Sequence, residues 1–260
     1  MNSHYLQTFA VLLYRDLGPI LKHLKSRLID SAVLVGAQLL AFTQFLPLLG
    51  MPRSMIAPAF IGIITQIFFS VGYSLAFKHI SDLQHTRFIE YQLSLPLPKK
   101  WLFAQYIVIC MLELLLVSLP LLVLGLLFLS DLFSLVHIKF FSLLIVYLYS
   151  LFFFALLFLY LAYSSNYLWF LDNIWARRLA PLFLLGCGFV SWKLVYAFSP
   201  VFGILLLCNP IVYVNEALRS SLLDSTHYLP LWICLAAITF FCVILCILFA
   251  RAVKNRIDPI

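Results

Sequence analysis

Residues 140–163 read FFSLLIVYLYSLFFFALLFLYLAY, a stretch of 24 residues without a single charge. A transmembrane α-helix needs about 20 consecutive apolar residues, because the hydrocarbon core of a bilayer is about 30 Å thick. Comparable apolar stretches occupy most of the remaining chain. They predict six spans, at about residues 29–50, 54–77, 101–129, 138–164, 179–198 and 229–251. We therefore expect an all-α polytopic membrane protein in which residues 1–260 form a single transmembrane domain.

The composition agrees with this fold class. Hydrophobic residues make up 64% of the chain and charged residues 10%, with a mean hydropathy of +1.06. An ordinary globular domain has about 25% charged residues. The net charge of +7 could suggest nucleic acid, but the placement of the charges argues against such a partner. The first 30 residues lack a leading apolar core, so no cleaved signal peptide is expected.

The basic residues predict the orientation. If both termini are cytoplasmic, thirteen of the 17 Lys and Arg lie in cytoplasmic segments: Arg15, Lys22, Lys25, Arg27, Lys78, Arg87, Lys99, Lys100, Arg177, Arg178, Arg251, Lys254 and Arg256. The outer segments hold Arg53, Lys139, Lys193 and Arg219. Basic residues resist translocation, so this asymmetry indicates the orientation of the spans. We expect a multi-pass protein of the plasma (inner) membrane. Residues 78–100 and 164–178 are then cytoplasmic.

Three segments depart from simple spans. Residues 4–17 suit either an amphipathic helix on the cytoplasmic surface or an early extension of the first span, and Gly18-Pro19 is expected to end that helix. Residues 78–101 predict a short helix with one apolar face. The apolar stretch 179–215 is too long for one span and contains several Pro and Gly. It predicts a span followed by short broken helices that re-enter the outer leaflet.

Few residues suggest chemistry. Glu113 is the only acidic residue deep inside a predicted span, where a charge costs about 2.5–3.5 kcal/mol on insertion scales. It has either a structural, protonated role or a place on a substrate path. The aromatic residues of 147–163 likewise suit a path or ordinary packing. The six Cys and six His show no ligand spacing, so no metal site is expected. Without a GxxxxGK[ST] phosphate loop, the chain is expected to be no ATPase by itself and to hold no cofactor.

Two polar segments carry more specific patterns. The first is RFIEYQLSLPLPKKW, residues 87–101, where a carboxylate and a short helix precede a proline stop and a basic anchor. The second is NPIVYVNEALR, residues 209–219. There Asn-Pro turns the chain, and Glu216 and Arg219 at i and i+3 share one helical face.

These segments resemble the permeases of type-2 ATP-binding-cassette exporters, the ABC-2 family. The family's loop after span two typically reads E-x-L-L-x-[ST]-P-[LV]-x-[KR], which Glu90, Leu93, Ser94, Pro96 and the nearby Lys99 match, with Gln92 where leucine is common. Its outer segment typically reads NP-x-x-Y-x-x-E-x-[LF]-R. The residues matching that pattern are Asn209, Pro210, Tyr213, Glu216, Leu218 and Arg219.

The resemblance implies a half-transporter that pairs with a second copy of itself or a paralogous permease. Two separate ATPase subunits would hold ATP and Mg²⁺. In this chain, the coupling helix that docks on an ATPase would comprise Arg87, Phe88, Glu90, Tyr91, Leu93 and Pro96, and the outer gate Asn209, Pro210, Tyr213, Glu216 and Arg219. Exchanging the charges of Glu216 and Arg219 is expected to restore more transport than either single change.

The expected function is export of a lipid-linked glycan, a lipid or a hydrophobic drug. One alternative is a membrane-embedded lipid-modifying enzyme, which needs clustered His, Asp or Glu at one membrane face. The other is an ion-coupled secondary transporter, which normally has several intramembrane ionisable groups and an inverted repeat.

Overall fold

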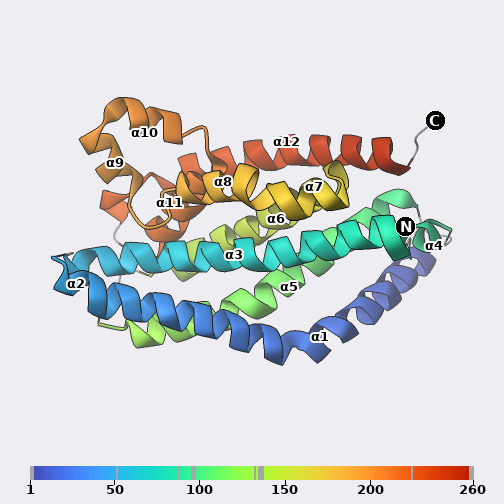
Figure 1. Cartoon of the computed structure of the whole chain (residues 1–260), viewed down its shortest axis with the longest axis horizontal. Coiled ribbons are helices and arrows are strands. Elements are labelled where there is room, and N and C mark those ends of the chain that lie inside the picture. The colour runs from blue at the N-terminus through green and yellow to red at the C-terminus, as the bar shows by residue number, and fades with distance from the viewer. Residues whose placement is uncertain are drawn as a thin grey trace.

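The computed structural model describes residues 3–50, 52–86, 88–94, 98–131, 133, 138–223 and 225–257, and every secondary-structure element within them is a helix (Figure 1). Five helical segments are long and apolar enough to cross a membrane: Gln7–Phe45, Arg53–Gln84, Lys99–Phe128, Phe140–Ser164 and Leu231–Arg256. The expected all-α fold with several membrane-compatible helices is confirmed at this level.

The first helix, α1 (Ser3–Leu40), continues through the π-helix η1 (Ala41–Phe45) into α2 (Leu46–Leu48). The expected helix end at Gly18-Pro19 is wrong, because Pro19 lies inside α1. Proline removes one backbone hydrogen bond, and a helix can bend there instead of ending. Figure 1 shows α1 as two arms that meet at a bend. Residues 4–17 thus belong to the first arm of this long helix, whose surface is largely exposed.

The core forms where α3 (Ile56–Ser81) packs against α6 (Phe140–Ser164) and α5 (Lys99–Phe128). Aromatic rings make many of the contacts in this core. Phe154 lies between Phe68 and Phe69, with ring centroids 5.1 and 5.3 Å away. Gly72 leaves room for the ring of Phe158, since a Cβ there would overlap it. The buried aromatic residues of α6 therefore fill the bundle core, as in the packing alternative.

Polar and short elements connect α3 to α5. The π-helix η3 (Asp82–Thr86) extends α3, and α4 (Phe88–Leu93) is the short helix expected in this region. Figure 1 places α4 at the same end of the bundle as the first turn of α1 and the last turn of α12 (Leu231–Ile257).

The fifth predicted span is wrong in its position. Residues 179–198 are not one helix, because 185–191 leave the helical conformation before α9 (Trp192–Phe198). Instead α7 (Tyr167–Ile174), the π-helix η4 (Trp175–Leu179) and α8 (Ala180–Leu184) form one run of residues 167–184. Three charges, on Asp172, Arg177 and Arg178, make this run look like a loop in the sequence.

Aromatic contacts hold the run 167–184 along α3. Tyr167 contacts Phe77, Phe170 stacks on Tyr73 at 5.2 Å, and Phe183 meets Phe69 at 5.6 Å between ring centroids. The contacts thus follow the run from one end to the other, and Figure 1 shows it beside α3.

Short helices follow the run 167–184, as the proline and glycine content predicted. After α9 come α10 (Pro200–Leu206) and α11 (Pro210–Leu222), which are bent relative to each other by 97°. A 3₁₀ turn, η5 (Ser225–His227), then leads to α12.

Candidate functional site

The predicted coupling residues lie on or around α4. Tyr91 is 60% exposed, whereas Leu93 is partly buried and packs against the core. Phe88 and Glu90 lie in α4, but their side chains, like all of Arg87 and Pro96, fall outside the described residues. Within the described part of this set, Tyr91 is the side chain that offers surface for docking.

A hydrogen bond fastens α4 to α5. Gln92 is buried, and its Oε1 accepts a hydrogen bond from the hydroxyl of Tyr106. Both side chains line a cavity of about 760 Å³ between α1, α3, α4 and α5. Charged and polar groups enter this cavity from three long helices, among them Arg15, Arg27, Lys78, His79, Asp82 and Glu113.

Glu113 has a partner that the sequence pattern did not reveal. Its carboxylate forms an ion pair with the guanidinium of Arg27 on α1. The Glu113 side chain is fully buried, while that of Arg27 is 30% exposed. The sequence placed Arg27 only among the cytoplasmic basic residues, and the packing of α1 against α5 brings it to Glu113. A paired carboxylate at this depth is far less costly than an isolated one.

A second polar contact joins the same two helices. Arg15 pairs with its neighbour Asp16 at 2.7 Å, and Asp16 Oδ2 accepts a hydrogen bond from the buried Gln105 of α5. The wall of the cavity is therefore a polar seam between α1 and α5. Such a seam can bind a polar or charged group and can shift if α1 moves relative to α5.

The predicted outer-gate residues lie at α11. Asn209 is the N-cap, since its Oδ1 accepts a hydrogen bond from the Ile211 backbone N–H at 3.0 Å, and Pro210 occupies the first turn. Both residue types suit a helix start. Asn209 Nδ2 also donates to the Leu182 carbonyl at 2.8 Å, and the Tyr213 hydroxyl donates to the Leu207 carbonyl at 2.9 Å. The predicted helix break at Asn209-Pro210 is confirmed.

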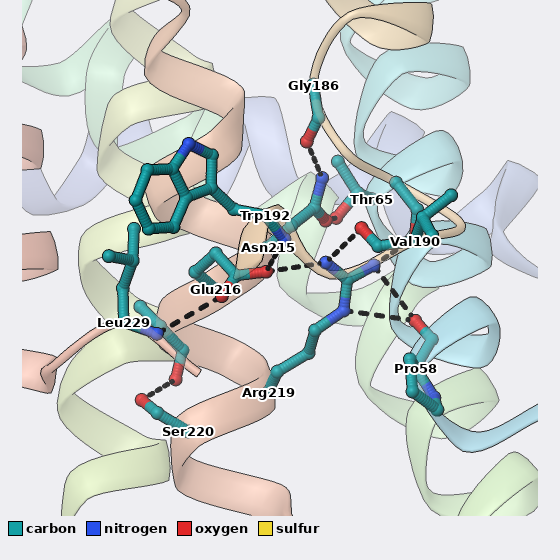
Figure 2. Close-up of polar contacts among 12 residues, drawn as sticks. Pro58, Thr65, Gly186, Val190, Trp192, Asn215, Glu216, Arg219, Ser220 and Leu229 are labelled. Carbon is teal, nitrogen blue, oxygen red and sulfur yellow. Dashed lines mark hydrogen bonds and ion pairs between the residues drawn. The ribbon is translucent and has the colours of Figure 1, made fainter. Parts of the chain in front are cut away.

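Glu216 and Arg219 pair inside the bundle (Figure 2). Arg219 Nη1 donates to Glu216 Oε1 at 2.9 Å, and both side chains are fully buried. The other donors of Arg219 reach backbone carbonyls: Val190 at 3.0 Å, Pro58 at 3.1 and 3.3 Å, and Gly188. All five N–H groups of the guanidinium are thereby used.

Besides Arg219, the carboxylate of Glu216 binds two backbone N–H groups. Oε1 accepts from the Trp192 N–H at 2.9 Å, and Oε2 accepts from the Leu229 N–H at 3.2 Å. One helical turn of α11 is therefore bonded to α3, to residues 185–191, to the start of α9 and to the segment before α12. We call Asn215, Glu216 and Arg219 with these partners the α11 hub.

Asn215 completes the α11 hub on the side of α3. Its Nδ2 donates to the Gly186 carbonyl at 2.7 Å, and its Oδ1 accepts from the Thr65 hydroxyl at 2.6 Å. Sequence reasoning missed Asn215 and Thr65. The one signal in the sequence is that each is a polar residue directly after a run of apolar ones. Their partners are far apart in the chain, so no local spacing marks them.

The buried cysteine side chains lie in less polar surroundings than these sites. Cys110, Cys187, Cys234 and Cys242 are buried, while Cys208 and Cys246 are exposed. Across the described ranges, no three His, Cys, Asp or Glu side chains lie close enough together to hold a metal ion.

The polar cavity and the α11 hub both hold buried charged side chains, and both connect helices that are distant in sequence. Comparison of the chain with models of known protein families, with curated proteins and with solved structures finds no match.

Proposed function

We propose that this chain is the membrane subunit of an ATP-driven exporter. It pairs with a second copy or a related permease, and two separate ATPase subunits bind ATP and Mg²⁺. The cargo class is a lipid-linked glycan, a lipid or a hydrophobic drug that leaves across the inner membrane. The resemblance of residues 87–101 and 209–219 to ABC-2 permeases motivates this assignment.

The observation that carries the proposal is the link between α4 and the polar cavity. Gln92 of α4 bonds to Tyr106 of α5, and both line the cavity that contains the Glu113–Arg27 pair. A subunit that docks on the exposed Tyr91 and displaces α4 therefore changes the wall of the cavity. This is the mechanical connection that an exporter needs between ATP hydrolysis and its cargo path.

We propose six spans, of which the fifth is residues 167–184 in place of 179–198, so Arg177 and Arg178 lie within this span and not in a cytoplasmic segment as the sequence suggested. Eighteen helical residues rise about 27 Å at about 1.5 Å per residue, close to the thickness of the hydrocarbon core. Both termini and α4 are then cytoplasmic, and α9, α10 and α11 form a re-entrant outer region. The α11 hub fixes this region to α3 through Pro58 and Thr65.

The docking step is tested at Tyr91. Replacing Tyr91→Asp places a charge at the proposed interface, where an unpaired buried charge is strongly unfavourable. Co-purification of the ATPase subunit from native membranes and its ATP hydrolysis are expected to fall. Tyr91→Phe keeps the ring and is expected to assemble normally, and the exposure of Tyr91 predicts an unchanged fold in both variants. Normal assembly and hydrolysis for Tyr91→Asp exclude the docking site.

The Glu113–Arg27 pair favours a second candidate, an ion-coupled secondary transporter. A buried carboxylate with a partly exposed basic partner inside a cavity is an arrangement that can exchange a proton. This candidate predicts that transport into vesicles without nucleotide follows an imposed pH gradient and is lost in Glu113→Gln. Transport that needs ATP and ignores the gradient rejects it.

A further inference from the structure

A second cavity, distinct from the polar cavity and bordered by the outer-gate residue Asn209, opens between α6, the run 167–184 and α10, with a volume of about 690 Å³. We call it the lateral groove. Its walls are mostly aliphatic, with Leu157 on α6, Leu182 on α8 and Leu205 on α10. Arg177 and Arg178 line it as well, and they precede its α8 wall along the helical run. The lateral groove therefore has a cationic end and an apolar body.

The arginine pair lies at the level of the apolar part of α3. Ring contacts place Trp175 beside Tyr73 and Phe183 beside Phe69, so the arginines fall between these two levels. Lys78 follows Tyr73 by five residues and Phe69 by nine. At about 1.5 Å per residue, the pair lies about 7–14 Å along α3 from Lys78, inside the proposed hydrocarbon layer.

No protein group neutralises these charges within the described part of the chain. Arg177 and Arg178 are both exposed, and neither has a carboxylate within ion-pair distance among the described residues. Arg178 lies over the ring of Trp169, with its guanidinium carbon 4.6 Å from the ring centroid. Stacking occupies the face of the guanidinium and leaves its N–H edge free to donate. Exposed cations at membrane depth are costly, and an anionic partner lowers that cost.

We propose that the lateral groove binds an anionic phospholipid of the surrounding bilayer. The phosphate oxygens accept hydrogen bonds from Arg177 and from the free edge of Arg178, since the planar fork of arginine matches phosphate. An acyl chain lies along the aliphatic wall formed by α8 and α10. A soluble anion satisfies the arginines but not the apolar body, whereas a phospholipid satisfies both. This binding does not depend on the proposed export function.

Quenching of tryptophan fluorescence by brominated lipid tests the proposal, because Trp169 and Trp175 lie next to the arginine pair. The delipidated protein is titrated in detergent with brominated phosphatidylglycerol or with brominated phosphatidylcholine of the same chains. Phosphatidylglycerol is expected to quench at a roughly tenfold lower concentration, the factor that one charge-assisted contact commonly supplies. Arg177→Gln with Arg178→Gln removes this preference. The matched control, Arg251→Gln with Lys254→Gln in α12, retains it.

One further variant and one competing anion separate the parts of the site. Leu182→Phe narrows the apolar body without adding a tryptophan and is expected to weaken quenching by both lipids while leaving the arginines in place. Inorganic phosphate is expected not to displace phosphatidylglycerol. An unchanged preference in the arginine double variant overturns the proposal, as does equal quenching by both lipids in the wild type. Displacement by phosphate also overturns it, because the ligand is then a free anion.

Discussion

Arg219 directs one N–H donor to Glu216 Oε1 at 2.9 Å and its other four to backbone carbonyls, while Glu216 also accepts from two backbone N–H groups. The pair is therefore directional. The cation faces acceptors and the carboxylate faces donors, so each side chain suits only its own position. We infer that the α11 hub is a fixed joint, around which any gating movement of α9 and α10 must occur.

Loss of the Arg219 side chain is expected to destabilise the fold strongly. Arg219→Ala leaves Glu216 charged and buried, and breaking a buried pair in this way costs about 3–5 kcal/mol. Exchanging the two charges is expected to give no rescue, contrary to the expectation from sequence, because a carboxylate at 219 faces carbonyl oxygens. The midpoint of thermal unfolding in detergent measures both effects. Ser220→Ala is the control, since among the described residues its hydroxyl donates to the Ala217 carbonyl of its own helix. A charge exchange that is more stable than both single variants contradicts the fixed joint.

Gly62 sets how closely α3 approaches residues 185–191. A Cβ at Gly62 overlaps the carbonyl of Gly188, which accepts a hydrogen bond from Arg219. Gly62→Ala is expected to destabilise the fold by about 1–3 kcal/mol, as overpacking does. Gly36→Ala in α1 meets open space and is expected to be neutral or stabilising by up to about 1 kcal/mol. Equal unfolding midpoints for the two variants argue against the close approach.

The two partners of the Glu113–Arg27 pair are expected to differ in how much stability is lost when each is replaced. Arg27→Gln leaves a fully buried carboxylate, whereas Glu113→Gln leaves a cation that still reaches the surface. We expect Arg27→Gln to lower the unfolding midpoint more, and the double variant to recover part of that loss. A double-mutant cycle gives the coupling, which is about 0.5–3 kcal/mol for contacting groups. Strictly additive losses show that the two side chains do not interact.

The proposed topology predicts which serines an impermeant thiol reagent reaches in intact cells. Ser81 ends α3 on the proposed cytoplasmic side, and Ser225 begins η5 on the outer side. In a cysteine-free background, Ser225→Cys is expected to react and Ser81→Cys to react only after the membrane is opened. Labelling of Ser81→Cys alone in intact cells reverses the orientation.

The sequence predicted those parts of the fold that depend on local pattern. Uncharged stretches mark α6 and most of α12, and Asn209-Pro210 marks the start of α11. The run 167–184 was missed because Arg177 and Arg178 interrupt its apolar character, although aromatic contacts with α3 hold it in the bundle.

In the candidate sites too, contacts between residues close in sequence were predictable, and contacts made by tertiary packing were not. Glu216 and Arg219 are three residues apart, so their pairing follows from helical spacing. Arg27 and Glu113 are distant in sequence, and only tertiary packing brings them together. The carbonyls of Pro58 and Gly188 are backbone groups, whose role no residue type reveals.

ATP dependence of transport tests the central proposal most directly. The chain is purified from native membranes in mild detergent with the subunits that accompany it and is reconstituted into proteoliposomes with fluorescent lipid. We predict an ATPase subunit in equal number to this chain, and lipid movement that needs ATP and Mg²⁺ and falls in Tyr91→Asp. Full lipid movement by the chain alone, without an ATPase subunit or nucleotide, contradicts the proposed function.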